Sequence, residues 1–167
     1  MRTTAAIAAL VLVSFAVPAA TTGARKMPRC AGSGLVVWLD TSPGGGAAGS
    51  VYYQLKFTNL VSHACHLFGF PGVSAVGLGG RQLGSAAARN HTRVARLVTL
   101  APGATAAAVL QVVHAENFPR ASCRQVTAAG LRVYPPDQTA SKLVPFPFRA
   151  CARSGPIYLT VQALRHA

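Results

Sequence analysis

Four cysteines are the residues of this chain whose number and spacing point most directly to a chemistry. They are Cys30, Cys65, Cys123 and Cys151. An even number of cysteines in an exported protein favours disulfide bonds, and four cysteines allow three connectivities. We favour the two pairs of sequence neighbours, Cys30 with Cys65 and Cys123 with Cys151. Each bond would stabilise the fold by roughly 3 to 4 kcal/mol in the chain-entropy description.

A metal site is the alternative chemistry for one of these cysteines, because His63, Cys65 and His66 lie close together in the sequence. In an extended segment His63 and Cys65 share one face while His66 points to the other. No Cys-x-x-Cys pair is present to complete a zinc site. We therefore interpret Cys65 as a disulfide cysteine between exposed histidines, and we expect no metal and no cofactor.

The charge balance is strongly basic, with 16 lysines and arginines against three acids, Asp40, Glu116 and Asp137, and a formal net charge of +13. Such a surface attracts anionic partners, and outside a cell these are lipid headgroups and envelope polymers rather than a specific nucleic acid. The alternative, without a specific partner, is that the charge only keeps the protein soluble. Nothing in the sequence indicates an oligomeric state.

The densest basic patch is the candidate contact for such anions and contains Arg89, His91, Arg93 and Arg96. In an extended chain Arg89, His91 and Arg93 would project from the same side. The same residues would equally make a solvated strand edge that discourages aggregation.

An enzymatic site finds little support in the inventory of reactive residues. The chain has three acids and five histidines, no Gly-x-Ser-x-Gly elbow and no two acids close together in the sequence. We therefore expect that the protein has no enzymatic activity. The alternative is an envelope hydrolase assembled from distant residues, which would need a histidine beside an acid in one pocket. The histidines that we consider for that role are His63, His66, His91 and His114.

The N-terminal segment predicts export. A basic start at Arg2 is followed by an apolar run over 5–20 and by small residues suited to cleavage between Ala19 and Ala24. We interpret 1–24 as a cleaved signal peptide, because the run is short for a membrane-spanning helix. The remaining chain would then be secreted or held in a periplasm-like envelope, with no transmembrane segment.

The sequence pattern predicts that short strands, separated by turns that contain Pro and Gly, position these residues. Residues 25–33 form a linker and the start of the first strand, and 34–167 form one domain. Lys142–Phe148 resembles an edge strand, because Pro145 and Pro147 cannot donate to a ladder. The pattern predicts an all-β antiparallel sandwich or barrel. Strands are expected at 35–39, 51–59, 73–78, 97–100, 104–113, 131–134, 142–148 and 157–163.

Three motifs stand out along the chain, namely Ala48-Gly49-Ser50-x-Tyr52 leading to Phe57-Thr58-Asn59, then Cys65-x-Leu67-x-Gly69-Phe70-Pro71-Gly72-Val73, and Leu100-Ala101-Pro102-Gly103. Together they resemble the actinobacterial exported family called domain of unknown function 4232, over about 30–163.

The resemblance implies an immunoglobulin-like sandwich with paired cysteines in a secreted or lipid-anchored envelope protein, and it brings no catalytic residues. Met27-Pro28-Arg29 ahead of Cys30 lacks the residues that precede a lipid-modified cysteine. We therefore expect a released, non-catalytic binding or structural module of the cell envelope, with affinity for its anionic components.

Overall fold

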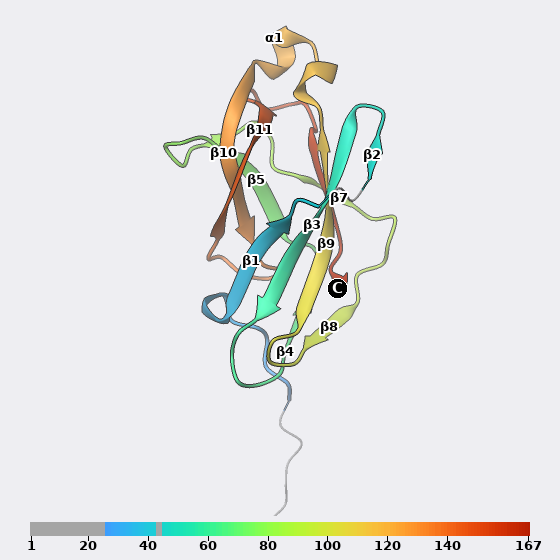
Figure 1. Ribbon diagram of the computed structural model, residues 1–167, viewed down its shortest axis with the longest axis vertical. Helices are drawn as coiled ribbons and strands as arrows, with labels where there is room; N and C mark the ends of the chain where they lie inside the picture. Colours follow the sequence, from blue (N-terminus) through green and yellow to red (C-terminus); the bar gives the residue numbers. More distant parts are fainter. Residues whose placement is uncertain (1–25, 43–44) are drawn as a thin grey trace, which may run out of the picture.

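The computed structural model describes residues 26–42 and 45–167, so the predicted signal peptide lies outside the described residues. Strands dominate these residues (Figure 1). No helix among the described residues is long and apolar enough to cross a membrane. The strands are β1 (Leu35–Asp40), β2 (Gly46–Ala47), β3 (Ser50–Asn59), β4 (Cys65–Phe68), β5 (Gly72–Val76), β6 (Gln82–Leu83), β7 (Ala88–Asn90), β8 (Leu97–Leu100), β9 (Thr105–Val113), β10 (Gln125–Tyr134), β11 (Lys142–Cys151), β12 (Leu159–Gln162) and β13 (Arg165–His166). The short helices are η1 (Gly32–Gly34), η2 (Ala115–Asn117) and α1 (Arg120–Cys123).

The larger sheet is built around β3 and β9, which pair along their whole lengths from Ser50 opposite Val113 to Thr58 opposite Thr105. Its strand order is β1-β3-β9-β12-β7, with β2 added to β3 and β13 added to β9. Leu55 and Phe57 of β3 are fully buried while Lys56 between them is partly exposed. The strand expected at 51–59 is therefore confirmed, and its second half shows the two-residue alternation of a half-buried strand.

The second sheet has the order β11-β10-β5-β6, and β4 pairs with β8 in a separate two-stranded ribbon. The strand β11 lies at the edge of its sheet, as its prolines predict. A bulge between Ala128 and Gly130 interrupts the β10–β11 ladder, where a side chain on Gly130 would meet the carbonyl oxygen of Val144. The close approach of the two backbones explains why glycine stands there.

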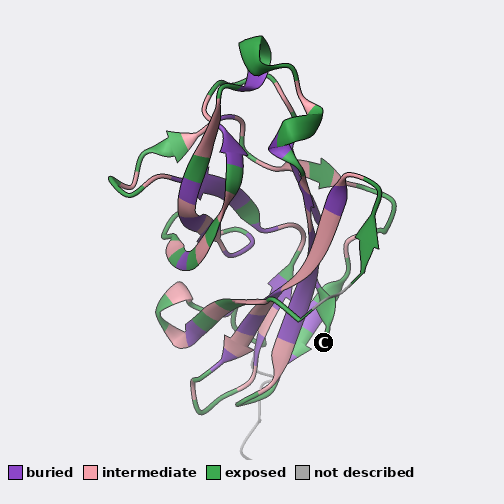
Figure 2. Ribbon diagram, turned by 45° about the horizontal axis from the view of Figure 1, so that its top comes forward, coloured by how far each residue is buried: buried purple, intermediate pink, exposed green. Residues whose placement is uncertain are grey.

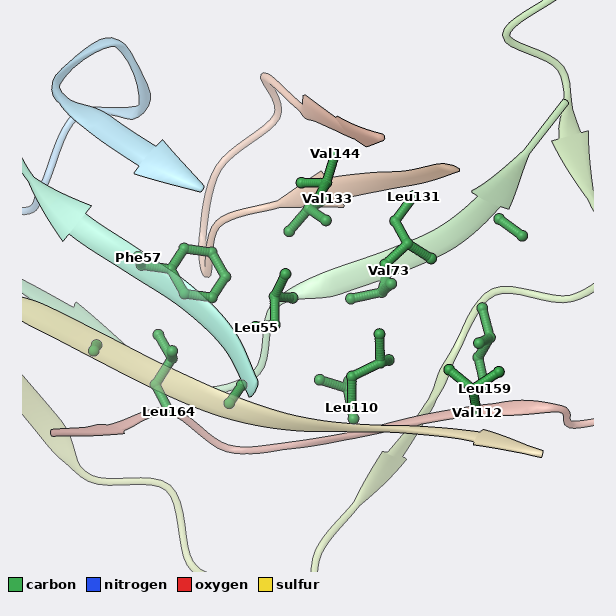
Figure 3. Packing of buried hydrophobic residues seen from close by; sticks show 14 of the residues in the cluster. Leu55, Phe57, Val73, Leu110, Val112, Leu131, Val133, Val144, Leu159 and Leu164 are labelled. Carbon is green, nitrogen blue, oxygen red and sulfur yellow. The ribbon is translucent and has the colours of Figure 1, made fainter. Parts of the chain in front are cut away.

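The hydrophobic core lies between the two sheets and makes the fold a β-sandwich. Leu55, Phe57 and Leu110 come from the larger sheet, and Val73 and Leu131 come from the second one (Figure 3). Figure 2 shows that buried residues follow the strands, while α1 and the β2 hairpin are largely exposed. The predicted all-β class is confirmed.

Two disulfides close the ends of the sandwich, and they join the sequence neighbours that we favoured. Cys30 is bonded to Cys65 with the Cα atoms 4.8 Å apart. Cys123 is bonded to Cys151 with the Cα atoms 4.5 Å apart. The first bond ties the segment before β1 to β4, and the second ties α1 to the end of β11.

Several local predictions need correction. The sandwich is not wholly antiparallel, because β7 pairs with β12 in parallel. The strand β4 was not predicted, and β10 begins at Gln125 rather than Leu131. The strand expected at 73–78 ends at Val76, the strand expected at 157–163 is shorter as β12, and β13 beyond it was not predicted. Parallel pairing joins segments far apart in sequence, so a local pattern does not reveal it.

Candidate functional site

The β4–β8 ribbon presents an uncovered outer face. Phe68 stands opposite Leu97, and these side chains are 49% and 60% exposed. The inward residues of the ribbon are buried in the core, namely Cys65, Leu67, Val98 and Leu100. The alternation of the two strands thus places an apolar ridge of Phe68 and Leu97 on the surface.

Asn59 at the end of β3 fixes the end of this ribbon. Its side chain is buried, and its Nδ2 donates to the carbonyl oxygens of His63 at 3.0 Å, Leu100 at 3.1 Å and Ala101 at 3.3 Å. Its Oδ1 accepts a bond from the backbone N–H of Val61 at 3.1 Å. One amide therefore connects β3, the loop before β4 and the end of β8.

The predicted basic patch is extended only at Arg89 and Asn90, so the condition under which Arg89, His91 and Arg93 would project from the same side is not met. The strand β7 ends at Asn90, whose Oδ1 accepts the backbone N–H of Thr92 at 2.9 Å and closes a turn. The guanidinium of Arg89 lies 5.8 Å from the ring centre of Phe70, and the His91 ring lies 4.7 Å from the same centre. Arg89 and His91 thus pack around one aromatic ring.

The other two residues of the basic patch, Arg93 and Arg96, line a groove with Arg165 and His166. We call it the basic groove. The sequence prediction missed Arg165 and His166. Pairing of β13 with β9 carries the C-terminal residues to this place. The apolar lining is Val94, Leu97, Val98, Ala163 and Leu164, and the groove has a volume of about 450 Å³.

The basic groove has no acidic lining residue. Guanidinium groups bind phosphate and carboxylate oxygens through paired N–H donors, and the apolar lining suits the carbon chain that bears such groups. The exposed Val94, 82% accessible, and the ridge residue Leu97 add apolar surface beside the arginines. The arrangement can bind an anion that also carries apolar parts.

A second, smaller hollow of about 190 Å³ shares Leu97 with the basic groove and has both His66 and Asp137 in its lining. Asp137 has a positive φ of 57° and forms an ion pair with Arg29 at 3.8 Å. The Nδ1 atom of His66 is buried and has no hydrogen-bond partner. The hollow therefore holds a histidine and an acid without a bond between them.

A third cavity, of about 280 Å³, opens between the two sheets and brings His114 near Glu116. The rings of Tyr53 and Phe146 lie 4.9 Å apart in an edge-to-face arrangement within it. Glu116 is paired with Arg149, with Nε and Oε1 3.5 Å apart. Partly buried aromatic rings and exposed charged side chains thus line the same cavity.

All three acids of the chain are paired with basic residues. Besides the two pairs above, Lys56 donates to Asp40 at 2.7 Å, and this bond is the main reason that the pKa of Asp40 falls to about 2. Neither the His66 hollow nor the His114 cavity has a serine or threonine in its lining, and Cys30 is held in a disulfide. The described residues contain no group of three or more metal-ligating side chains.

A cluster of arginines at the α1 end also escaped the sequence prediction. Arg120, Arg124 and Arg149 line a hollow of about 360 Å³ together with Gln125. We call it the arginine hollow. Its arginines are up to 29 positions apart in the chain, so only pairing of the cysteines beside them, at 123 and 151, could have indicated that they meet.

The model of the family described as domain of unknown function (DUF4232) matches residues 30–165. No curated protein and no solved structure matches the chain significantly. The matched range contains both disulfides and most residues of the basic groove.

Proposed function

We propose that this chain, which belongs to the family described as domain of unknown function (DUF4232), is a non-catalytic module that binds anionic components of a cell envelope. The observation that carries the proposal is the basic groove, where Arg93, Arg96 and Arg165 meet beside apolar side chains with no acid in the lining. The two disulfides suit an oxidising compartment outside the cytoplasm.

The groove accounts for anion affinity better than total charge does. The formal net charge of +13, or +12 once Arg2 leaves with the predicted signal peptide, acts over the whole surface, but the three arginines of the groove line one hollow. Converging positive charges raise the local concentration of anions and leave N–H donors for paired bonds to phosphate oxygens. Phosphate-bearing lipids and polymers therefore fit the groove.

Retention on anionic envelope material tests the proposal. The probes are vesicles of phosphatidylglycerol and a poly(glycerol phosphate) polymer, with phosphatidylcholine vesicles as the neutral control. We expect retention at low salt to fall sharply as salt rises through about 0.1 M, where the Debye length is about 10 Å. The variant Arg93→Glu with Arg96→Glu should lose most of the retention.

A matched variant separates the groove from general charge. Arg81 and Lys142 lie outside the groove, and replacing both by glutamate changes the net charge by the same amount. We expect this variant to keep most of the retention. Equal losses in the two variants would mean that total charge, rather than the groove, holds the anion.

The alternative function is an envelope hydrolase, and the observation that favours it is the approach of a histidine to an acid in two cavities, at His66 with Asp137 and at His114 with Glu116. The hydrolase alternative is weakened because both acids are already paired with arginines. Release of soluble products from envelope preparations tests it. Activity that is lost in His66→Ala or His114→Ala would replace the binding proposal by the hydrolase.

A further inference from the structure

We propose that the arginine hollow is a second anion site, independent of the basic groove, and that it takes a ligand with two neighbouring phosphate groups. Its guanidiniums come from α1, from the residue that caps α1 and from β11. The hollow of about 360 Å³ lies within the range of about 300–1,000 Å³ that small ligands occupy.

Backbone bonds around one disulfide fix where these arginines stand. Cys123 lies between Arg120 and Arg124 and is bonded to Cys151, two residues after Arg149. The backbone N–H of residue 152 donates to the carbonyl oxygen of Arg124 at 3.0 Å, and that of residue 153 donates to the carbonyl oxygen of Cys123 at 3.1 Å. The arginine-bearing segments are therefore held side by side.

The backbone conformation of Arg124 also supports an anion site in the arginine hollow. It adopts the left-handed conformation, with φ 47° and ψ 79°, at the end of α1. Glycine or asparagine is usual at such a position, and a long side chain there is uncommon. The backbone N–H of Arg124 donates to the carbonyl oxygen of Arg120 at 2.9 Å, which ends the helix and turns the chain into β10.

Charge in the hollow is poorly balanced. Three arginines line it, and one of them, Arg149, is paired with an acid, since its Nε lies 3.5 Å from Oε1 of Glu116. Both side chains of this pair are about half exposed, so the pair is weak. An anion with several oxygens would engage the terminal nitrogens of the arginines and relieve their mutual repulsion.

The expected ligand class follows from the number of donors. A single guanidinium pairs with two oxygens of one phosphate, so three guanidiniums around one hollow suit a diphosphate better than one phosphate. Inorganic pyrophosphate is the simplest probe. We expect it to bind more tightly than orthophosphate at equal ionic strength.

The test is a titration of the disulfide-bonded protein with pyrophosphate at constant ionic strength, followed by the backbone amide shifts of the labelled protein. Signals of residues 120–125 and 149–153 should move. Arg120→Gln with Arg124→Asn should weaken binding at least about tenfold, the size expected when charge-assisted hydrogen bonds are lost. Asparagine tolerates the left-handed conformation, so the fold should survive the change.

Two matched controls keep the result interpretable. Arg93→Gln with Arg96→Gln removes the same charge from the basic groove, and it should leave the pyrophosphate affinity read from the shifts of residues 120–125 and 149–153 unchanged while lowering retention on envelope material. Glu116→Gln should tighten binding because Arg149 loses its competitor. Asp137→Asn removes one acid elsewhere and should not tighten pyrophosphate binding, since Asp137 is paired with Arg29.

Three results would overturn the proposal. They are an equal loss of pyrophosphate affinity in the two double arginine variants, amide shifts confined to residues 93–98, and an equal gain of affinity in Glu116→Gln and Asp137→Asn. Failure of the basic groove to hold envelope anions would leave this site untouched, because its variants and probe are different.

Discussion

Replacing the buried Asn59 by alanine should lower the free energy of unfolding by about 3 kcal/mol. The side chain is 1% exposed, and its amide nitrogen lies within 3.3 Å of the carbonyl oxygens of His63, Leu100 and Ala101. Alanine would remove both donors and leave these oxygens, which lie near the core, without that partner. The bond from the backbone N–H of Val61 would be lost as well.

The magnitude follows from the number of hydrogens. An amide NH₂ has two, so the three carbonyl contacts amount to about two full hydrogen bonds, and the Val61 bond makes about three. A bond of this kind contributes about 1 kcal/mol net, and an unsatisfied buried group costs about 1–3 kcal/mol. Partial access of water to the loop carbonyls keeps the sum near the lower end.

Asn59→Asp sharpens the test because it keeps the shape and replaces the donor by an acceptor. A carboxylate facing carbonyl oxygens in a buried place is disfavoured, so the folded-state pKa should lie above the unfolded value of about 3.9. The folded state then binds more protons than the unfolded state, and the stability of the variant falls as pH rises through this range. The deficit against wild type should be largest near neutral pH and shrink below about pH 4.

Urea denaturation of the disulfide-bonded proteins, followed by circular dichroism between pH 3 and 7, measures both effects. A loss below about 1 kcal/mol for Asn59→Ala would refute the reasoning, because it would mean that water or backbone shifts replace the amide. A pH-independent deficit for Asn59→Asp would refute the assignment of the amide nitrogen to the carbonyl side.

Three further outcomes are expected. Replacing Cys123 and Cys151 by serine should lower stability by about 3.5 kcal/mol in urea denaturation, since the bond closes a loop spanning 28 positions. The Lys56 bond lowers the pKa of Asp40 to about 2, so the stability that this ion pair contributes is full above about pH 4 and is lost as pH falls through 2. In Asp40→Asn the free energy of unfolding should therefore lack this loss when it is measured against falling pH. Gly84→Ala should cost more than about 2 kcal/mol by thermal unfolding, because φ is 61° and the added Cβ would lie 2.6 Å from the carbonyl oxygen of Cys151.

The strands with clear alternation or a run of apolar residues were predictable from sequence, and the shortest or bulged ones were not. In β3 the residues Leu55 and Phe57 alternate with polar ones, so the strand and its buried face followed directly. In β10 the small residues from Ala128 to Gly130 contain a bulge and hide the alternation. The four residues of β4 are too few to show a period beside a turn.

The binding sites depended on tertiary pairing, which sequence patterns do not reveal. Arg93 and Arg96 were recognised as basic, but the turn closed by Asn90 changed their direction. Arg165 reaches the groove only because β13 pairs with β9. Arg124 meets Arg149 only because the neighbouring cysteines are bonded.

The α1 end and the β4–β8 end lie apart along the long axis of the molecule (Figure 1), and this separation makes the protein a potential cross-linker. A short anion cannot fill both sites of one molecule, so the second site is left for another ligand. With long phosphate polymers, turbidity should therefore rise and then fall as protein is added, because excess protein coats each chain singly. A monovalent variant, with Arg120→Gln and Arg124→Asn, should bind polymer through the remaining groove without making the solution turbid.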